Sequence, residues 1–174
     1  MAAAIQPGTD QVWDWLSQVP DPEIPVISLT DLGIIRDVAW QDDTLVVTVT
    51  PTYSGCPATG IINLDIETAL RGHGIDKLRL ERQLSPAWTT DWITEGGREK
   101  LRAYGIVPPI DGTAADGRLA GRIARLAGSS NLTIACPRCN STQTEKLSQF
   151  GSTPCKACYR CKDCLEPFDY FKCI

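Results

Sequence analysis

Seven of the eight cysteines of this 174-residue chain stand in its last forty residues. Six of them form three Cys-x-x-Cys pairs: Cys136/Cys139, Cys155/Cys158 and Cys161/Cys164. Two such pairs on hairpin turns place four thiolates at the corners of a tetrahedron, the geometry that Zn(II) accepts from sulfur. A tail of about forty residues has too small a core to fold alone, so a metal would supply stability. The tail is therefore predicted to be a zinc ribbon.

The second pair of zinc ligands is less directly indicated than the first. Fifteen residues separate Cys139 from Cys155, within the usual spacing of zinc sites, and 21 separate Cys139 from Cys161, one more than usual. The later pair, however, precedes the aromatic, strand-like segment 168–171. This is the position expected for a zinc-binding turn between two strands. We therefore predict Cys136, Cys139, Cys161 and Cys164 as the metal ligands, with Cys155 and Cys158 as the alternative second pair.

An iron–sulfur cluster is the competing interpretation of the tail. The four cysteines from Cys155 to Cys164 form an unbroken C-x2-C-x2-C-x2-C run, close to the bacterial ferredoxin pattern. The last interval is one residue shorter than in that pattern, no proline directly follows Cys164, and the Cys136/Cys139 pair would have no role. The remaining tail cysteine, Cys173, is interpreted as a small buried side chain.

Cys56 stands alone in the sequence PTYSGCP, where a strand ends and a helix begins. Pro57 suits the first helical position, which would make Cys56 the N-cap residue. The helix dipole and the free N–H groups there favour a thiolate, which can bind a soft metal ion or act as a nucleophile. A buried structural cysteine explains this position equally well, because free cysteine packs like a small hydrophobic residue.

Three carboxylates, Asp21, Glu23 and Asp31, are candidates to lie near that thiol. Residues of this kind in DP and TDLG sequences more often cap turns and helices, and we favour that role. His73, the single histidine, lies between two glycines at the end of a predicted helix and is expected at the surface. A Cys–His nucleophile pair therefore has only one poorly placed candidate.

The elements that must position these side chains follow from hydrophobic periodicity and turn residues. Helical patterns end at residues that suit caps or stops, and strand patterns alternate between apolar and polar positions. In the last strand, Leu78, Leu80 and Leu84 are expected to point inward. The predicted helices cover residues 9–19, 58–72 and 94–104, and the predicted strands cover 34–40, 44–50 and 77–84, the first two joined by a hairpin at 41–43.

The composition changes between the helical and the cysteine-rich parts of the chain. Residues 107–131 are rich in Pro, Gly and Ala and are predicted to be a linker with one short helix near 118–126. We therefore divide the chain into an N-terminal domain (1–106), this linker (107–131) and the zinc ribbon (132–174).

Charge and hydrophobicity exclude several classes of function. The net charge of −4, from 17 basic and 21 acidic residues, and the absence of a basic stripe argue against nucleic-acid binding. No apolar stretch is long enough to span a membrane, and the first residues lack the features of a signal peptide. We therefore expect a cytoplasmic protein, in which cysteines serve as metal ligands or reactive thiols more often than as disulfides.

Two sets of motifs resemble known families. DPEIPVISLTDLGIIRDV, followed by a strand and PTYSGCPAT, resembles the MIP18-like (DUF59) domain of iron–sulfur assembly factors. Together with SPAWTTDW, GIVPP, CPRC, FGSTPCKACYRCKDC and EPFDYFKCI, these motifs resemble the D subunits (PaaD, also called PaaJ) of phenylacetyl-CoA epoxidase systems. The resemblance implies an α/β (α+β) MIP18-like domain with a small mixed sheet and two to three helices, followed by a small all-β zinc ribbon.

The resemblance also implies a function. In the aerobic phenylacetate pathway the partners would be the di-iron oxygenase and the iron–sulfur flavoprotein reductase, and a chain of this family would be a non-catalytic accessory component. It would assist iron–sulfur or di-iron cluster assembly; a structural zinc-binding subunit of the oxygenase is the alternative. Cys56 matches the functional thiol of the family, in transient contact with iron or an iron–sulfur cluster, and Asp21 and Glu23 match its DPE motif. Whether the chain forms a homodimer stays open.

Overall fold

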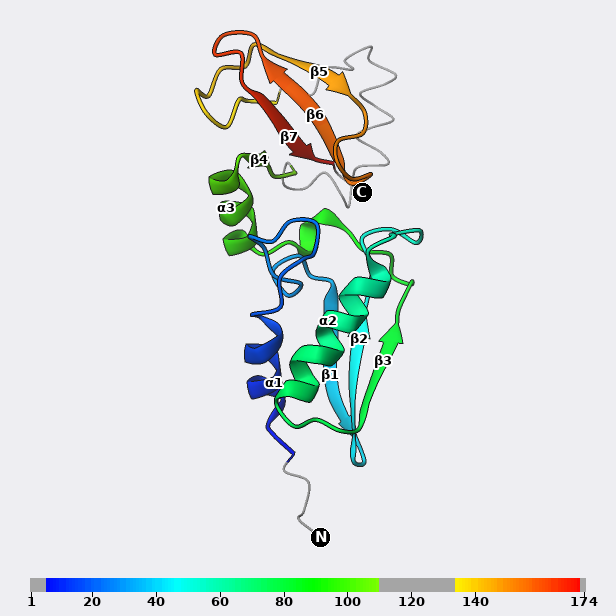
Figure 1. The fold of residues 1–174 in the computed structure, drawn as a ribbon. Coiled ribbons are helices and arrows are strands. Elements are labelled where there is room, and N and C mark those ends of the chain that lie inside the picture. Colours follow the sequence, from blue (N-terminus) through cyan, green and yellow to red (C-terminus); the bar gives the residue numbers. More distant parts are fainter. Residues whose placement is uncertain (1–5, 110–133, 173–174) are drawn as a thin grey trace. The chain divides into compact units, whose positions relative to one another are not determined.

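The computed structural model describes residues 6–109 and 134–172. Cys173 and the short helix predicted near 118–126 lie outside these ranges. Within them, no helix combines the length and the apolar character needed to cross a membrane. The chain divides between Trp88 and Thr89 into two compact units, and each unit is described by itself (Figure 1).

The first unit is built on a three-stranded mixed sheet in the order β1-β2-β3. The strands are β1 (Ile35–Gln41), β2 (Thr44–Val49) and β3 (Leu78–Arg82). β1 and β2 pair antiparallel through a short hairpin, in which Asp42 adopts a left-handed conformation (φ 54°). β2 and β3 pair in parallel. The predicted hairpin and the small mixed sheet are both present.

Two helices cover this sheet. Parallel strands need a crossover connection, and α2 (Thr59–Gly72) supplies it between β2 and β3 (Figure 1). Its apolar stripe of Ile62, Ile66 and Leu70 is buried, as helical spacing predicts. The other helix, α1 (Thr9–Leu16), packs against α2 and β1.

His73, at the end of α2, is exposed as predicted. Its ring stacks on Trp15 of α1, with ring centroids 4.0 Å apart and an angle of 2° between the planes. The histidine therefore joins the two helices rather than facing Cys56.

One apolar position was wrongly predicted. Leu84 is 54% exposed instead of inward, because β3 ends at Arg82 and the alternation of the strand does not continue beyond it. Leu78 and Leu80, within the strand, are half-buried.

The second unit contains a four-stranded sheet in the order β4-β7-β6-β5. β5 (Thr144–Ser148), β6 (Lys156–Cys161) and β7 (Pro167–Phe171) form an antiparallel ribbon. β4 (Ile106–Val107) adds to its edge by pairing in parallel with β7.

The segment before β4 begins with a short 3-10 helix, η1 (Thr90–Trp92), and continues with α3 (Glu95–Tyr104). The Thr94 hydroxyl caps α3 by accepting a hydrogen bond from the N–H of Gly97 at 3.0 Å. Gly105 ends the helix in a left-handed conformation (φ 90°), which glycine adopts without steric cost. Both ends of α3 lie where the sequence predicts them.

The two compact units do not follow the predicted division at 106 and 132. One reason is β4, which lies across the predicted boundary, with Ile106 in the predicted N-terminal domain and Val107 in the predicted linker, and which pairs with the last strand of the ribbon. The boundaries drawn from composition stay a proposal about domains.

The burial of α2 gives a first test. Replacing Ile66 by Ala should lower the free energy of unfolding by about 2–5 kcal/mol, because the side chain is fully buried and its loss leaves a cavity. Ile61→Ala is the matched control, since Ile61 lies on the same helix but is 53% exposed. Urea unfolding followed by circular dichroism measures both; equal effects would contradict the described packing of α2.

Candidate metal centre and candidate thiol

Two short turns, here called the first knuckle (136–141) and the second knuckle (161–166), carry the cysteines of the candidate metal centre. The first precedes β5, and the second joins β6 to β7. In the first, the N–H of Cys136 donates to the carbonyl of Ser141; in the second, the N–H of Cys161 donates to the carbonyl of Glu166, both at 2.9 Å. Each knuckle is thus closed by the same backbone hydrogen bond.

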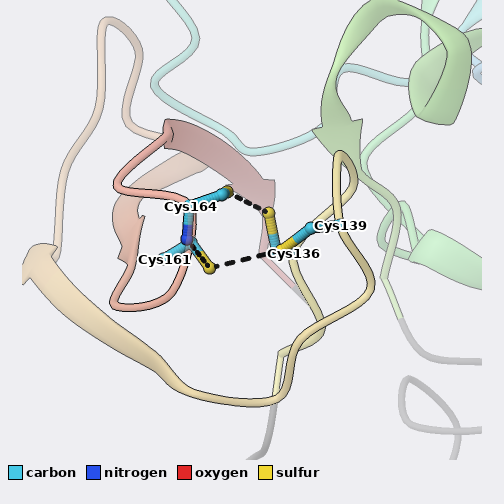
Figure 2. A group of neighbouring side chains, drawn as sticks. All are labelled: Cys136, Cys139, Cys161 and Cys164. Atoms are coloured by element: carbon cyan, nitrogen blue, oxygen red, sulfur yellow. Dashed lines mark hydrogen bonds between the residues drawn. The ribbon is translucent and has the colours of Figure 1, made fainter.

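The four thiols of the knuckles converge. The sulfur atoms of Cys136, Cys139, Cys161 and Cys164 all lie within 4.8 Å of one another (Figure 2). The Cys136–Cys164 and Cys139–Cys161 sulfur pairs are each 3.6 Å apart. These separations are far too long for disulfides, and the cysteines are free.

This spacing fits a single zinc ion. With Zn–S bonds of about 2.3 Å in a tetrahedron, neighbouring sulfurs would lie about 3.8 Å apart. The irons of a four-iron cluster, each bound to its own cysteine, would need the sulfurs farther apart. The donor set, four thiols and no other group, is that of a closed structural zinc site.

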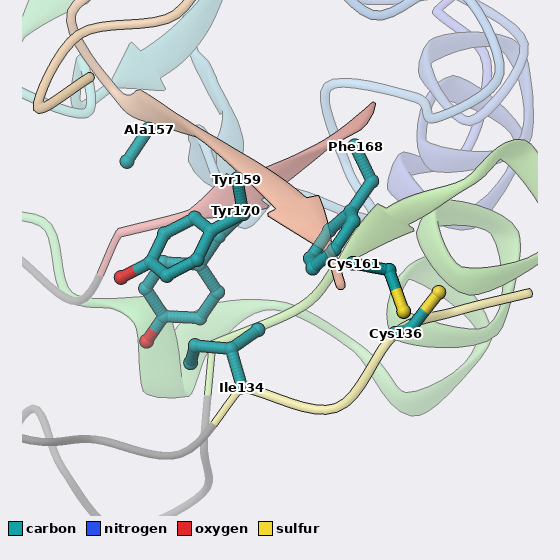
Figure 3. Close-up of a cluster of buried hydrophobic side chains, with 7 residues drawn as sticks. All are labelled: Ile134, Cys136, Ala157, Tyr159, Cys161, Phe168 and Tyr170. Carbon is teal, nitrogen blue, oxygen red and sulfur yellow. The ribbon is translucent and has the colours of Figure 1, made fainter. Parts of the chain in front are cut away.

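The candidate centre lies at the edge of the hydrophobic core of the ribbon. Cys136 and Cys161 are fully buried members of that core, whereas Cys139 and Cys164 are exposed. Tyr159 packs between two other rings, with its centroid 5.9 Å from those of Phe168 and Tyr170. Figure 3 shows the whole core: Ile134, Cys136, Ala157, Tyr159, Cys161, Phe168 and Tyr170.

The protonation of these thiols is uneven. The backbone N–H groups of Cys164 and Asp163 point at the sulfur of Cys161 and lower its pKa to about 7. The N–H of Ser141 favours the thiolate of Cys139 as well, but the neighbouring thiols and partial desolvation raise the pKa of Cys139 to about 12. Without a cation, the four thiols therefore do not ionise together at neutral pH.

Cys155 and Cys158 lie apart from this group. Cys155, directly before β6, is buried, and its sulfur lies 3.0 Å from the Thr153 hydroxyl. Cys158 lies within β6 opposite Asp169. Cys158 and Cys161 are three positions apart on one strand and so point to opposite faces. The four cysteines of the ferredoxin-like sequence are thus spread from the residue before β6 to the turn after it and do not form one cluster. Within the described ranges, the one group of side chains with the geometry of a metal site is formed by the four cysteines of the two knuckles.

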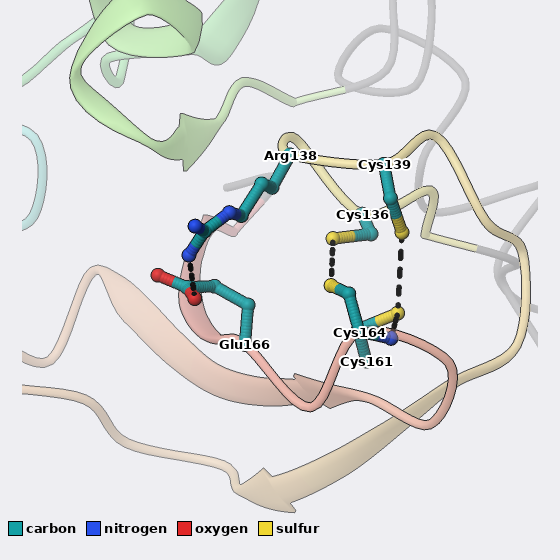
Figure 4. A network of polar contacts seen from close by, with 6 residues as sticks. All are labelled: Cys136, Arg138, Cys139, Cys161, Cys164 and Glu166. Carbon is teal, nitrogen blue, oxygen red and sulfur yellow. Dashed lines mark hydrogen bonds and ion pairs between the residues drawn. The ribbon is translucent and has the colours of Figure 1, made fainter.

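Two side chains beside the thiols were not singled out from the sequence. Arg138, inside the first knuckle, forms an ion pair with Glu166 at the end of the second (Figure 4). Glu166 raises the pKa of Arg138, and Cys164 and Cys136 add to that effect by Coulombic attraction. Cysteine spacing gives no signal for this contact, since Arg138 and Glu166 are 28 residues apart.

Cys56 lies in the connection between β2 and α2, as predicted, but it is not the N-cap residue. α2 begins at Thr59, and Ala58 precedes it as the N-cap. The N-cap was predicted two residues too early because a separate turn comes first: the carbonyl of Cys56 accepts hydrogen bonds from both the N–H (3.3 Å) and the hydroxyl (2.8 Å) of Thr59.

The backbone around Cys56 is held from both sides. Its N–H donates to the carbonyl of Tyr53 at 3.2 Å, and Arg82 of β3 donates to the carbonyl of Ser54 at 2.6 Å. The Cys56 side chain is half-buried. The backbone that carries the thiol is therefore held in the loop that follows β2, a strand that pairs in parallel with β3, and functional loops of α/β folds often follow such strands.

The acidic residues have turn-forming contacts. The Asp21 carboxylate is buried and accepts hydrogen bonds from the N–H groups of Glu23 (2.9 Å) and Ile24 (2.8 Å). Asp31 receives the N–H of Ser28 at 3.4 Å and donates its own N–H to the Ser28 hydroxyl at 3.1 Å. Glu23 is half-buried beside Asp21. Asp21 and Asp31 thus have the capping roles favoured from the sequence.

Two families match the two parts of the chain. The family described as iron–sulfur cluster assembly protein matches residues 9–76, which include Cys56, Asp21 and Glu23. The family described as PaaD zinc beta ribbon domain matches residues 123–172, which include both knuckles.

Individual relatives agree with these matches. A protein of Escherichia coli (strain K12), named as a candidate D subunit of 1,2-phenylacetyl-CoA epoxidase, is 47% identical over all of this chain and 98% of its own length. An Fe-S protein maturation auxiliary factor of Porphyromonas gingivalis is 34% identical over 46% of this chain and 77% of its own length. A DUF59 domain structure from Bacillus anthracis has a TM-score of 0.50 and 24% identity, covering 53% of this chain and 89% of that one, and it supports the fold alone.

Cysteine substitutions test the candidate metal centre. Purified wild-type protein should contain about one equivalent of zinc, and Cys161→Ser should lose it because a site of four thiolates needs all four. Cys158→Ser is the matched control on the same strand and should keep the zinc. Elemental analysis measures the zinc, and near-ultraviolet circular dichroism reports the packing of Tyr159 and Tyr170. Equal zinc in both variants would contradict this ligand set.

Zinc retention should also depend on pH. Zinc must displace protons from thiols such as Cys139, whose pKa is raised to about 12, so binding strengthens as pH rises and weakens as it falls. The apparent affinity should change by about tenfold per pH unit for each proton released. Competition with a chromophoric chelator between pH 6 and 8 measures this slope. An affinity independent of pH would mean that the ligands are not thiols.

Proposed function

The chain belongs to the family of 1,2-phenylacetyl-CoA epoxidase D subunits, and from this premise we propose that it is an accessory component of such an epoxidase system in aerobic phenylacetate degradation. We propose further that it assists the assembly or insertion of an iron–sulfur or di-iron cluster. Its partners would be the di-iron oxygenase and the iron–sulfur flavoprotein reductase of that system.

One observation carries the proposal. A half-buried thiol, Cys56, lies on a fixed loop at the carboxyl end of β2, inside the segment that matches the iron–sulfur cluster assembly family. The same chain also carries a ribbon of the PaaD type. The combination supports an assembly factor dedicated to one oxygenase system rather than a general one.

The chemistry assigned to Cys56 is ligand exchange. Its thiol gives up a proton to solvent, and the sulfur donates an electron pair to an iron of the transferred cluster, the cargo of the protein, as a ligand of the donor leaves that iron. On delivery, a ligand atom of the recipient, a thiolate in the case of an iron–sulfur cluster, forms the new bond to iron and the bond to Cys56 breaks. No change of oxidation state is needed. A single protein thiol is a weak ligand by itself, which suits transient binding.

Asp21 and Glu23 are assigned a supporting role. The Asp21 carboxylate organises the turn at 21–24 through two backbone hydrogen bonds, and Glu23 follows on that turn. The ribbon is assigned one structural zinc held by Cys136, Cys139, Cys161 and Cys164, and it would dock another component of the system. Both assignments are part of the proposal.

A second candidate function is a structural zinc-binding subunit of the oxygenase complex, without a role in assembly. The burial of Cys136 and Cys161 in the core of the ribbon favours it, because a metal there serves the fold. The two functions differ in what they require of Cys56: cluster assembly needs the thiol, and a purely structural role does not.

Replacing Cys56 by Ser separates these functions. The variant is co-expressed with the di-iron oxygenase and the reductase, and the iron content and turnover of both partners are measured after purification. The iron content should fall toward that of partners expressed without this chain, because serine is a poor ligand for iron in a cluster.

Cys158→Ser is the matched control, since it removes another half-buried thiol that lies outside both candidate sites. It should leave the iron content unchanged. Full iron loading and turnover with Cys56→Ser would contradict the assembly role and leave the structural function.

A further inference from the structure

The two knuckles have matching positions and matching contacts. Each runs Cys-x-x-Cys and is closed by a hydrogen bond from the N–H of its first cysteine to the carbonyl five residues later. In each, the residue after the second cysteine is in a left-handed conformation: Asn140 has φ 58° and Leu165 has φ 63°. The thiols follow the same pattern, because the first cysteine of each knuckle lies 3.6 Å from the last cysteine of the other.

The side chains repeat this relationship. Arg138, two positions into the first knuckle, forms an ion pair with Glu166, which ends the second. Asp163, two positions into the second knuckle, accepts a hydrogen bond from the hydroxyl of Ser141, which ends the first. The residues whose carbonyls close the knuckles, Ser141 and Glu166, are thus the same residues whose side chains reach across to the opposite knuckle.

We propose that these two reciprocal contacts, Arg138–Glu166 and Ser141–Asp163, are latches that hold the knuckles together around the metal and set the rate at which the metal is lost. The inference rests on the proposed metal site. Loss of a four-coordinate ion requires its thiolates to separate from it, and each contact joins one knuckle to the other and so resists that separation. The latches act through the cysteines and are positioning residues, not ligands.

The exposure of the candidate centre explains why such contacts would matter. Cys139 and Cys164 are exposed, so water and competing ligands reach the metal from that side. Cys136 and Cys161 are anchored in the core of the ribbon and move with it. The latches lie on the knuckles themselves, where the core gives no support.

The test is the rate of zinc transfer from the full-length holoprotein to an excess of a chromophoric chelator at fixed pH. Arg138→Gln and Glu166→Gln should each speed zinc loss by about three- to tenfold. This increase lies between the small effect of removing an exposed ion pair and the larger effect of removing a hydrogen-bond partner of a metal ligand. The double variant should be no faster than the faster single variant, because either change opens the same latch. Ser141→Ala should also speed zinc loss. In a variant that carries both Ser141→Ala and Arg138→Gln, the two fold-increases in rate should multiply, because the two contacts are separate.

Lys162→Gln is the matched control. It removes one positive charge from the second knuckle, but Lys162 pairs with Glu145 of β5 and not with the first knuckle. It should lose zinc at the wild-type rate. Circular dichroism confirms that each variant is folded before the rates are compared.

Several results would overturn the inference. If Arg138→Gln loses zinc no faster than Lys162→Gln, the Arg138–Glu166 contact does not slow zinc loss. A fast Arg138→Gln with an unchanged Glu166→Gln, or a double variant as fast as the product of the singles, would show that the contact between them is not what holds the metal. A wild-type protein that binds no zinc contradicts the metal site itself, and the latches with it, while leaving the proposed role of Cys56 untouched.

Discussion

Repulsion among four closely spaced thiolates is the constraint on which the ribbon depends. All four sulfurs lie within 4.8 Å of one another, and negative charges at such separations disfavour one another's ionisation. Backbone N–H groups lower the pKa of Cys161 to about 7, whereas neighbouring thiols and desolvation raise the pKa of Cys139 to about 12, so the four thiols do not ionise together. A divalent cation offsets the repulsion, since it pairs with every thiolate at once. The fold thus brings together four thiols that can all ionise once a divalent cation binds among them.

The same reasoning separates the two kinds of cysteine in the chain. Four thiolates complete the tetrahedral shell of zinc and leave no open position, so such a site serves structure. Cys56 is a single thiol, and a metal or cluster bound to it keeps other positions for ligands from a partner. Its loop is held by Tyr53, Thr59 and Arg82, which fix the backbone and leave the side chain half-buried. Fixed backbone and partial exposure suit a thiol that exchanges ligands.

Much of the fold follows from local sequence patterns. Hydrophobic periodicity and turn residues predicted α2, the hairpin and both ends of α3, because each of these signals acts within a few residues. Leu84 was predicted wrongly because alternation does not reveal where an edge strand stops. The N-cap of α2 was placed two residues early, at Cys56, because proline fits a turn before a helix as well as the helix itself.

The candidate site was less predictable, because it depends on long-range contacts. Spacing between cysteines favoured Cys155/Cys158, and the strand-like segment after Cys164 favoured Cys161/Cys164; their place along β6 decides which thiols face the first knuckle. The ion pair of Arg138 with Glu166 left no trace in the sequence, since either residue alone resembles any exposed charge. The link is visible once both turns are known, because the contacting residues occupy equivalent positions. One member of each contact stands two positions after the first cysteine of its knuckle, and the other stands five positions after the first cysteine of the opposite knuckle.

β4 shows how far the ribbon extends beyond its cysteines. Its two residues pair with Asp169 and Tyr170 of β7, and Val107 packs against the core that contains Cys136 and Cys161. Without β4, the backbone of β7 would be an open edge next to aromatic side chains, the kind of edge that invites pairing with another chain. A ribbon cut at residue 132 would keep all four candidate ligands and still lack this strand. The unit that stabilises the candidate metal centre therefore includes Ile106 and Val107 as well as the cysteine-rich tail, although the cysteines alone suggest a self-contained tail.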